Sequence, residues 1–298
     1  MRKIMSTPSI VVAIALVSRV LSAQSPNVRF SDTFSPGPSQ LWSNFFGNWT
    51  ANAGQYFAQV PNNNPLTYTG LPFDLTSYTL TVTVNQLADG GIWLRSTENN
   101  PSLATSIVLI LGGGGYGQGT RGGNAGTAIH FQTLTGCCVN QVNGVFTPGD
   151  TYTLKITVQD NNYSVYVNGS NTPVITLADS TFKHGQVGLY DDQPNTTTGN
   201  GSGPPTTFSN FSITGLPVPP RIAPFSPTSG PVHTKVEIKG TNLQLASAVT
   251  FNGKAAAFRQ EYPSTEITAA VPAGATTGLI AVITPLDTFT SATDFTVP

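Results

Sequence analysis

Charged side chains are scarce in this chain of 298 residues. Asp, Glu, Lys and Arg together make up 9% of it, against roughly 25% of an average soluble domain. The formal net charge is −1 and no long basic run occurs, so the chain lacks the positive surface that binding to a nucleic-acid backbone requires. Its polarity comes from Ser, Thr, Asn and Gln. With 30 Gly and 23 Pro, this composition predicts an exported, turn-rich, all-β protein and no nucleic-acid partner.

Apolar runs long enough to span a membrane are also lacking. The run at Ile10–Val17 is too short to cross about 30 Å of hydrocarbon as a helix. It follows the basic residues Arg2 and Lys3 and precedes small residues around Ala23, as in a secretion signal. We predict a signal peptide at residues 1–23, a secreted or cell-surface protein, and no membrane span in the mature chain. An N-terminal membrane anchor is the alternative.

Helical periodicity is nearly absent after Phe30, and alternating strand patterns take its place. Residues 77–87, 152–160 and 162–169 alternate β-branched or aromatic residues with polar ones, as half-buried strands do. The turn "QDNN" joins the last two as a hairpin. Ser106–Leu111 is apolar on both faces and suits a central strand. These segments predict a β-sandwich.

Four prolines in "TGLPVPPRIAP" mark a domain boundary, with a Pro-rich linker at 216–223. After it come "SPTSGP", a turn entering a strand, the alternating "KVEIKG", and "FNGKAA", a hairpin with Asn252-Gly253 at its tip. In this order the segments resemble the IPT/TIG family of immunoglobulin-like domains. The resemblance implies a smaller immunoglobulin-like β-sandwich at 224–298. Such a domain would act as a spacer or as a docking unit for a protein partner.

The first domain, residues 24–215, carries "FSDTF", a Trp-bearing strand in "NWTANAGQYFAQV", the strand "GGIWLRS", and "FKHGQVGLYDD" before "FSNFSITG". This order resembles the concanavalin-like jelly-roll domains. They include laminin-G-like modules and the family known as 3-keto-disaccharide hydrolases. The resemblance implies a two-sheet sandwich with one concave face and two functions to weigh, glycan binding and sugar hydrolysis.

Catalytic groups are few. Glycosidases usually place two carboxylates across the scissile bond. The first domain has a single Glu, Glu98, and a strand would send the adjacent Asp191 and Asp192 to opposite faces. The chain has only three histidines and no Gly-x-Ser-x-Gly elbow. The sequence therefore favours a non-catalytic protein over an enzyme and leaves a glycoside or keto-sugar hydrolase as the alternative.

An aromatic and polar face is the stronger functional signal. In "GGIWLRS", Ile92 and Leu94 point one way and Trp93 and Arg95 the other. Trp stacks well on sugar rings and Arg donates several hydrogen bonds. The glycine-rich segment "LGGGGYGQGTRGGNAG" has no helix after it to bind phosphate and is predicted to be a loop over this face. The predicted glycan-binding residues are Trp93, Arg95, Tyr116, Arg121, His130, Tyr190 and Asp191. Packing of Trp93 in the core is the alternative.

A structural Ca²⁺ between the first and last strands is a further possibility that the resemblance implies. Asp32 in "FSDTF" and Asn210 in "FSNFS" are its candidate ligands. The alternative role of Asp32 is to cap a turn. No other cofactor is expected.

The two cysteines, Cys137 and Cys138, are adjacent. Without a second cysteine pair or a clustered His they lack the ligands of a structural zinc site, and they do not form a Cys-x-x-Cys redox motif. An oxidising compartment favours disulfides. We predict a vicinal disulfide in a loop beside the binding face, where it forms a rigid apolar turn. A cross-link to another chain is the alternative.

Together these features predict a secreted or cell-surface, non-catalytic protein that binds carbohydrate on the jelly-roll face. Its partner would be an extracellular polysaccharide or a glycosylated surface. The alternatives are a sugar hydrolase related to the 3-keto-disaccharide hydrolases and a structural surface protein without a small ligand.

Overall fold

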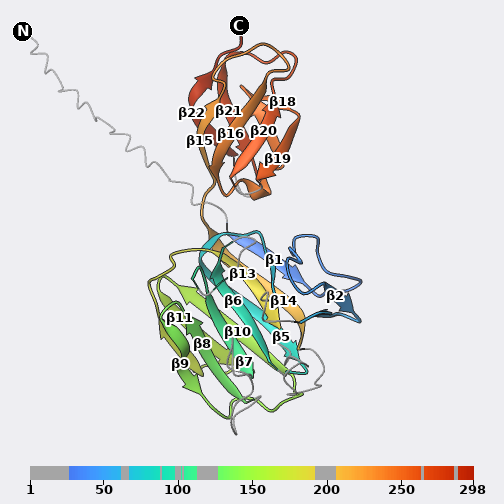
Figure 1. Cartoon of the computed structure of the whole chain (residues 1–298), viewed down its shortest axis with the longest axis vertical. Helices are drawn as coiled ribbons and strands as arrows, with labels where there is room; N and C mark the ends of the chain where they lie inside the picture. The colour runs from blue at the N-terminus through green and yellow to red at the C-terminus, as the bar shows by residue number, and fades with distance from the viewer. Residues whose placement is uncertain are drawn as a thin grey trace, which may run out of the picture.

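The computed structural model describes residues 27–61, 67–87, 89–97, 102, 104–112, 127–191, 206–262, 265–284 and 288–298. The predicted signal peptide lies outside them. The described residues form strands and one short 3-10 turn, with no α-helix among them. Figure 1 shows two β-sandwiches, one beyond the other along the long axis, with the C-terminus on the second. The predicted all-β architecture of two sandwiches is confirmed.

The first sandwich consists of two antiparallel sheets. The larger sheet has the order β12-β11-β10-β5-β14-β3-β2, with β1 paired to β14, and the smaller has the order β4-β13-β6-β7-β8-β9. The larger sheet contains β1 (Val28–Asp32), β2 (Trp49–Asn52), β3 (Gln55–Ala58), β5 (Leu75–Asn85), β10 (Tyr152–Gln159), β11 (Asn162–Val167), β12 (Ile175–Ala178) and β14 (Thr207–Pro217). The smaller contains β4 (Thr69–Gly70), β6 (Gly90–Ser96), β7 (Ile107–Gly112), β8 (Ala128–Thr133), β9 (Gly136–Val142) and β13 (Gln186–Asp191).

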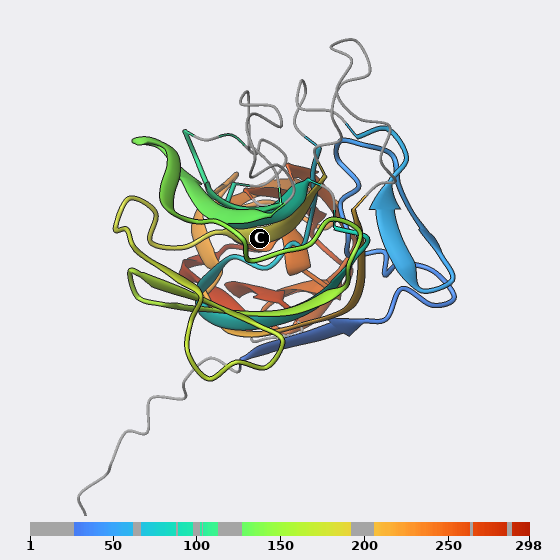
Figure 2. The ribbon, with the colours of Figure 1, turned by 90° about the horizontal axis from the view of Figure 1, so that it is seen from below.

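The core of this sandwich lies between the two sheets, which face each other as layers in Figure 2. The alternation in β5 and β10 sends one face of each strand inward, and Leu80 of β5 pairs with Ile156 of β10. Both side chains are fully buried, as are Ile92 and Leu94 of β6. Every second residue of these strands thus points into the space between the sheets, as expected for half-buried strands.

The second sandwich has two four-stranded sheets, of order β15-β16-β20-β19 and β18-β17-β21-β22. Val236 and Ile238 of β16 are fully buried in its core. The hairpin at Asn252-Gly253 has positive φ at both residues, 43° and 79°, as a two-residue I′ turn requires. Its elements are β15 (Arg221–Ser226), β16 (Lys235–Thr241), the 3-10 turn η2 (Leu243–Leu245), β17 (Ala248–Phe251), β18 (Lys254–Ala256), β19 (Phe258–Tyr262), β20 (Glu266–Ala270), β21 (Gly278–Ile283) and β22 (Thr288–Phe295).

The connection between the sandwiches is shorter than the linker predicted at 216–223. Strand β14 continues to Pro217 and β15 begins at Arg221, because Gly215, Leu216 and Pro217 pair with β5. Leu245 of the second sandwich packs against the core cluster of the first. Within the described residues, no helix has the length and apolar character needed to cross a bilayer.

Candidate functional site

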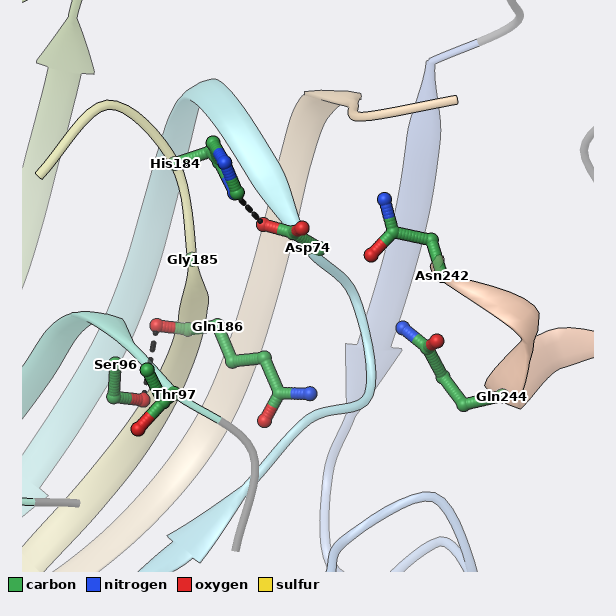
Figure 3. A pocket seen from close by; sticks show the side chains of 8 residues that line it. All are labelled: Asp74, Ser96, Thr97, His184, Gly185, Gln186, Asn242 and Gln244. Atoms are coloured by element: carbon green, nitrogen blue, oxygen red, sulfur yellow. Dashed lines mark hydrogen bonds and ion pairs between the residues drawn. The ribbon is translucent and has the colours of Figure 1, made fainter. Parts of the chain in front are cut away.

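A polar pocket of about 190 Å³ lies where the two sandwiches meet (Figure 3). One wall comes from the first sandwich, at the chain before β5, the end of β6 and the turn before β13. The other wall comes from the segment that leads into η2 of the second sandwich. The side chains that line it are polar apart from one glycine: Asp74, Ser96, Thr97, His184, Gly185, Gln186, Asn242 and Gln244.

His184 and Asp74 form a hydrogen-bonded ion pair on one side of the pocket. His184 Nδ1 donates to Asp74 Oδ1 over 2.8 Å. The side chain of Asp74 is mostly covered, whereas that of His184 is 52% exposed. Because Nδ1 carries the donated proton, Nε2 is the free ring atom and accepts a hydrogen bond when the imidazole is neutral. The pair thus presents an oriented imidazole to a ligand.

Gln186 extends across the floor of the pocket and is held by its neighbours. Ser96 Oγ donates to the Gln186 carbonyl oxygen over 3.2 Å, and the Tyr68 hydroxyl donates to Gln186 Oε1 over 3.5 Å. Since Oε1 is engaged from below, the amide nitrogen is the group that points toward the second sandwich in Figure 3. The floor therefore offers a positioned N–H donor.

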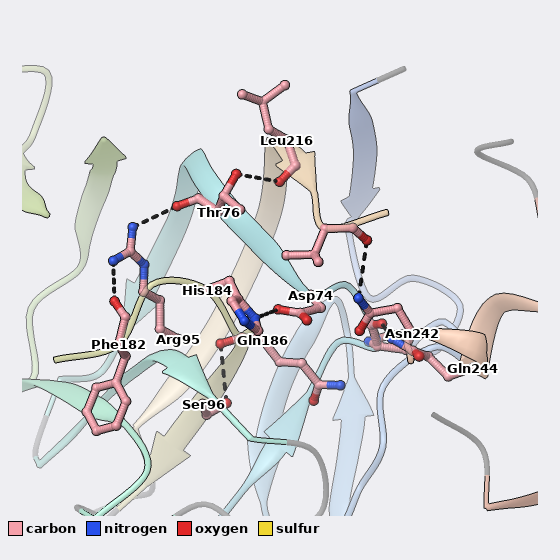
Figure 4. A network of polar contacts seen from close by, with 12 residues as sticks. Asp74, Thr76, Arg95, Ser96, Phe182, His184, Gln186, Leu216, Asn242 and Gln244 are labelled. Atoms are coloured by element: carbon pink, nitrogen blue, oxygen red, sulfur yellow. Dashed lines mark hydrogen bonds and ion pairs between the residues drawn. The ribbon is translucent and has the colours of Figure 1, made fainter. Parts of the chain in front are cut away.

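The side chains of Asn242 and Gln244 form the opposite wall, and each donates a hydrogen bond to a backbone carbonyl oxygen. Asn242, in the left-handed region at φ 58°, donates from Nδ2 to the Val218 oxygen over 3.3 Å. Gln244 donates from Nε2 to the Pro72 oxygen of the first sandwich over 2.7 Å. Figure 4 shows this network next to the His184–Asp74 pair. These bonds hold both amide groups in place and tie the two sandwiches together.

The chemistry of the pocket suits a small neutral polar group. Its volume is below the roughly 300–1,000 Å³ of pockets for drug-sized ligands, so it accommodates one small unit and not a long chain. Amide, imidazole and hydroxyl groups donate and accept hydrogen bonds without demanding a charged partner. Among the described residues, Asp74 is the one carboxylate that lines the pocket, whereas a standard glycosidase uses two.

The second sandwich, which forms this wall, matches a known domain family. The sequence profile of the IPT/TIG domain family matches residues 220–297. These residues form an IPT/TIG domain. The predicted resemblance is confirmed for this part of the chain, and Asn242 and Gln244 show that the IPT/TIG domain contributes side chains to the pocket.

Solved structures similar to this chain include carbohydrate-binding module CBM66 from Bacillus subtilis, at 11% identity, 59% coverage of this chain and 93% of that one, and a TM-score of 0.39. Lectin II from Ulex europaeus has 12% identity, 63% and 97% coverage, and a TM-score of 0.44. A putative glycosyl hydrolase from Parabacteroides distasonis has 12% identity, 62% and 88% coverage, and a TM-score of 0.39. No sequence among curated proteins matches the chain.

The outer face of the smaller sheet holds Trp93 and Tyr190 side by side. Their ring centroids lie 6.0 Å apart in an edge-to-face arrangement. They belong to a separate apolar cluster with Tyr68, Val108 and Ile110. However, Trp93 is only 1% exposed, so its ring is not the open stacking surface that the sequence analysis expected. The alternative of a packed Trp93 describes this structure, although on the outer face and not between the sheets.

The prediction that Arg95 lies beside Trp93 is wrong. Arg95 has φ 50°, and the pairing of β6 with β13 shifts register at this point, so the alternation of faces is interrupted. The buried guanidinium instead donates to the backbone oxygens of Phe182, Thr76 and Asp160. It also lies over the ring of Tyr163, 5.3 Å from the centroid. Arg95 therefore connects chain segments at the end of the sandwich.

His130 and Asp191 are buried, with exposed fractions of 1% and 0%, so neither presents its side chain to solvent. Burial lowers the pKa of His130 to about 4, which keeps the imidazole neutral at physiological pH. Tyr116 and Arg121 lie outside the described residues. The five predicted residues that the structure describes are each at most 1% exposed and form no open surface: Trp93, Arg95, His130, Tyr190 and Asp191.

The cysteine pair lies in β9, at the edge of the smaller sheet, and not in a loop. The sulfur atoms of Cys137 and Cys138 are adjacent, and Cys138 has φ 62°. The expectation that no histidine clusters with them is wrong, because the ligand atoms of His130, Cys137 and Cys138 all lie within 4.8 Å of one another. Sequence could not show this, since pairing of β8 with β9 creates the proximity.

Asp32 accepts hydrogen bonds at the turn after β1, the alternative role considered for it. The Phe34 amide donates to Oδ1 over 2.7 Å, and the Ser39 amide and Trp42 Nε1 donate to Oδ2 over 2.8 and 2.9 Å. Asn210 lies in β14 next to Phe211, the pairing partner of Asp32. Calcium binding by Asp32 and Asn210 stays a prediction.

None of the pocket residues is among those that the sequence predicts to bind a ligand. Asp74 and His184 are 110 positions apart, and Pro72 and Gln244 are 172 apart. Neither Asn242 nor Gln244 belongs to a recognisable motif. The available signal was polar residues at strand ends, which are common in turn-rich proteins.

Proposed function

We propose that this chain is a non-catalytic carbohydrate-binding protein whose glycan enters the pocket between the two sandwiches. The observation that carries the proposal is the lining of that pocket, in which oriented amides, an imidazole and hydroxyls come from both domains. A sugar unit offers alternating hydroxyl donors and acceptors, which match such groups. In this proposal the protein is secreted or surface-held, and the IPT/TIG domain completes the site.

The size of the pocket favours one exposed or terminal sugar unit over several. His184 donates to Oδ1 of Asp74, and a carboxylate has further lone pairs that can accept from a sugar hydroxyl. Hydrogen bonds to such fixed groups lose little conformational entropy when the ligand binds. The proposed partner is therefore a neutral glycan on an extracellular polysaccharide or a glycosylated surface.

The test is a glycan array with the labelled full-length chain, followed by calorimetry on the strongest binder. We expect His184→Ala and Gln186→Leu each to weaken binding by about tenfold, because each removes hydrogen bonds to the ligand. Gln141→Ala is the matched control: Gln141 is an exposed amide in β9, outside the pocket. It should change affinity less than about twofold.

Each other outcome contradicts the proposal in a distinct way. Binding that survives both pocket substitutions would locate the glycan elsewhere on the jelly roll. Release of reducing sugar or ketosugar from the bound glycan would favour the hydrolase. Absence of both binding and turnover on the array would leave the structural role.

A further inference from the structure

His130 is a buried polar side chain that neither lines the pocket nor belongs to the hydrophobic core. It projects from β8 and is 1% exposed. Neither Nδ1 nor Nε2 has a hydrogen-bond partner. A buried polar atom left unpaired destabilises the folded state, so such an exception calls for an explanation. Its strand neighbours Ile129 and Phe131 face the core between the sheets, whereas His130 lies on the opposite face, where it pairs with Ile110 of β7.

The unpaired imidazole lies next to both sulfur atoms of the chain. Strand β9 pairs with β8 at the edge of the sheet, and the ligand atoms of His130, Cys137 and Cys138 are within 4.8 Å of one another. The two cysteines are partly exposed, so a small ion can reach them from solvent. Since neither ring nitrogen is engaged in a hydrogen bond, the neutral imidazole has a nitrogen lone pair available to a metal ion.

We propose that reduction of Cys137 and Cys138 opens a three-donor site for the soft cation Cu(I), with two thiolates and the His130 imidazole as ligands. Thiolate sulfur selects soft ions such as Cu(I), and imidazole also suits copper. Cu(I) is satisfied by two or three ligands, whereas structural Zn²⁺ takes four. Three donors from adjacent strands therefore match Cu(I) best.

The site is gated by the oxidation state of the sulfur pair. In a disulfide the sulfurs bond each other and no thiolate is present. A phosphine reductant and one water convert the disulfide into two thiols and one phosphine oxide. Each thiol then loses a proton when its sulfur binds the metal, while the neutral His130 loses none, so one Cu(I) displaces two protons.

The test is an anaerobic titration of the phosphine-reduced full-length chain with Cu(I), in competition with bicinchoninate. We expect one Cu(I) per reduced chain and none on the air-oxidised chain. The double variant Cys137→Ser/Cys138→Ser should lose binding, and His130→Asn should weaken it by on the order of tenfold or more. His184→Asn, a histidine outside the cluster, should bind as the unmodified chain does.

X-ray absorption of the copper-loaded chain keeps the proposal testable if His130→Asn does not fold. It should show two sulfur atoms and one imidazole nitrogen around the metal. Two sulfurs without imidazole would overturn the assignment of His130. A reduced chain that binds Zn²⁺ but not Cu(I), or neither ion, would overturn the copper site.

Discussion

Replacing Arg95 with Met is expected to destabilise the first sandwich by on the order of 3–5 kcal/mol, the largest effect of a single substitution that we predict. Three backbone oxygens, of Thr76, Asp160 and Phe182, accept from the guanidinium. Met keeps the apolar stem and removes all the donors, so three partly buried acceptors lose their partner inside the protein. The loss of the charge over Tyr163 adds to the cost.

The measurement is thermal and denaturant unfolding of the full chain followed by circular dichroism. The melting temperature should fall by on the order of 10 °C. Arg29→Met is the matched control, because Arg29 is an exposed arginine of β1, and it should change stability by less than about 0.5 kcal/mol. Equal losses in the two variants would mean that the bonds of Arg95 contribute nothing beyond those of a surface arginine. Arg95→Lys keeps the charge but not the planar guanidinium. Its free energy of unfolding should lie between that of the unmodified chain and that of Arg95→Met.

Arg95 also shows where sequence patterns stop being informative. The alternation in "GGIWLRS" placed Ile92 and Leu94 in the core and Trp93 on the opposite face, and the structure agrees. One residue further, a positive φ at Arg95 interrupts the alternation. The turn before β13 makes this possible: Gly185 packs against the Arg95 backbone so closely that a Cβ would collide with it. Nothing in the local pattern marks that contact.

The candidate site illustrates the same limit at longer range. The strands follow from period two and from turn residues, which are local properties, and the IPT/TIG domain is predicted from the resemblance of its segments to that family. The pocket depends on how two sandwiches dock, through Gln244 and the Pro72 oxygen and through Leu245 on the first core. Docking is set by contacts between distant segments, so polar residues at strand ends do not reveal it. Likewise, His130 joins the cysteines only through the pairing of β8 with β9.

Lowering the pH from about 6.5 to 4 is expected to destabilise the oxidised chain by about 3 kcal/mol through His130 alone. Its pKa is lowered from 6.5 to about 4 because burial disfavours the charged imidazole. In this interval the unfolded chain binds a proton at position 130 and the folded chain does not. Stability therefore falls as the pH falls. Well above pH 6.5 both states are neutral at this residue and its contribution to the pH dependence vanishes.

Denaturant unfolding of the unmodified chain and of His130→Gln at pH 7, 6, 5 and 4 isolates this contribution. All other titratable groups are common to both proteins, so their contributions cancel in the difference. The gap in unfolding free energy between the two should shift by about 3 kcal/mol in favour of the variant between pH 7 and 4. His184→Gln serves as the control, since the unpaired, buried imidazole of His130 is retained in it. Parallel pH profiles for the unmodified chain and His130→Gln would show that the imidazole is protonated as easily in the folded state as in the unfolded one, in conflict with its burial between β7 and the cysteine pair.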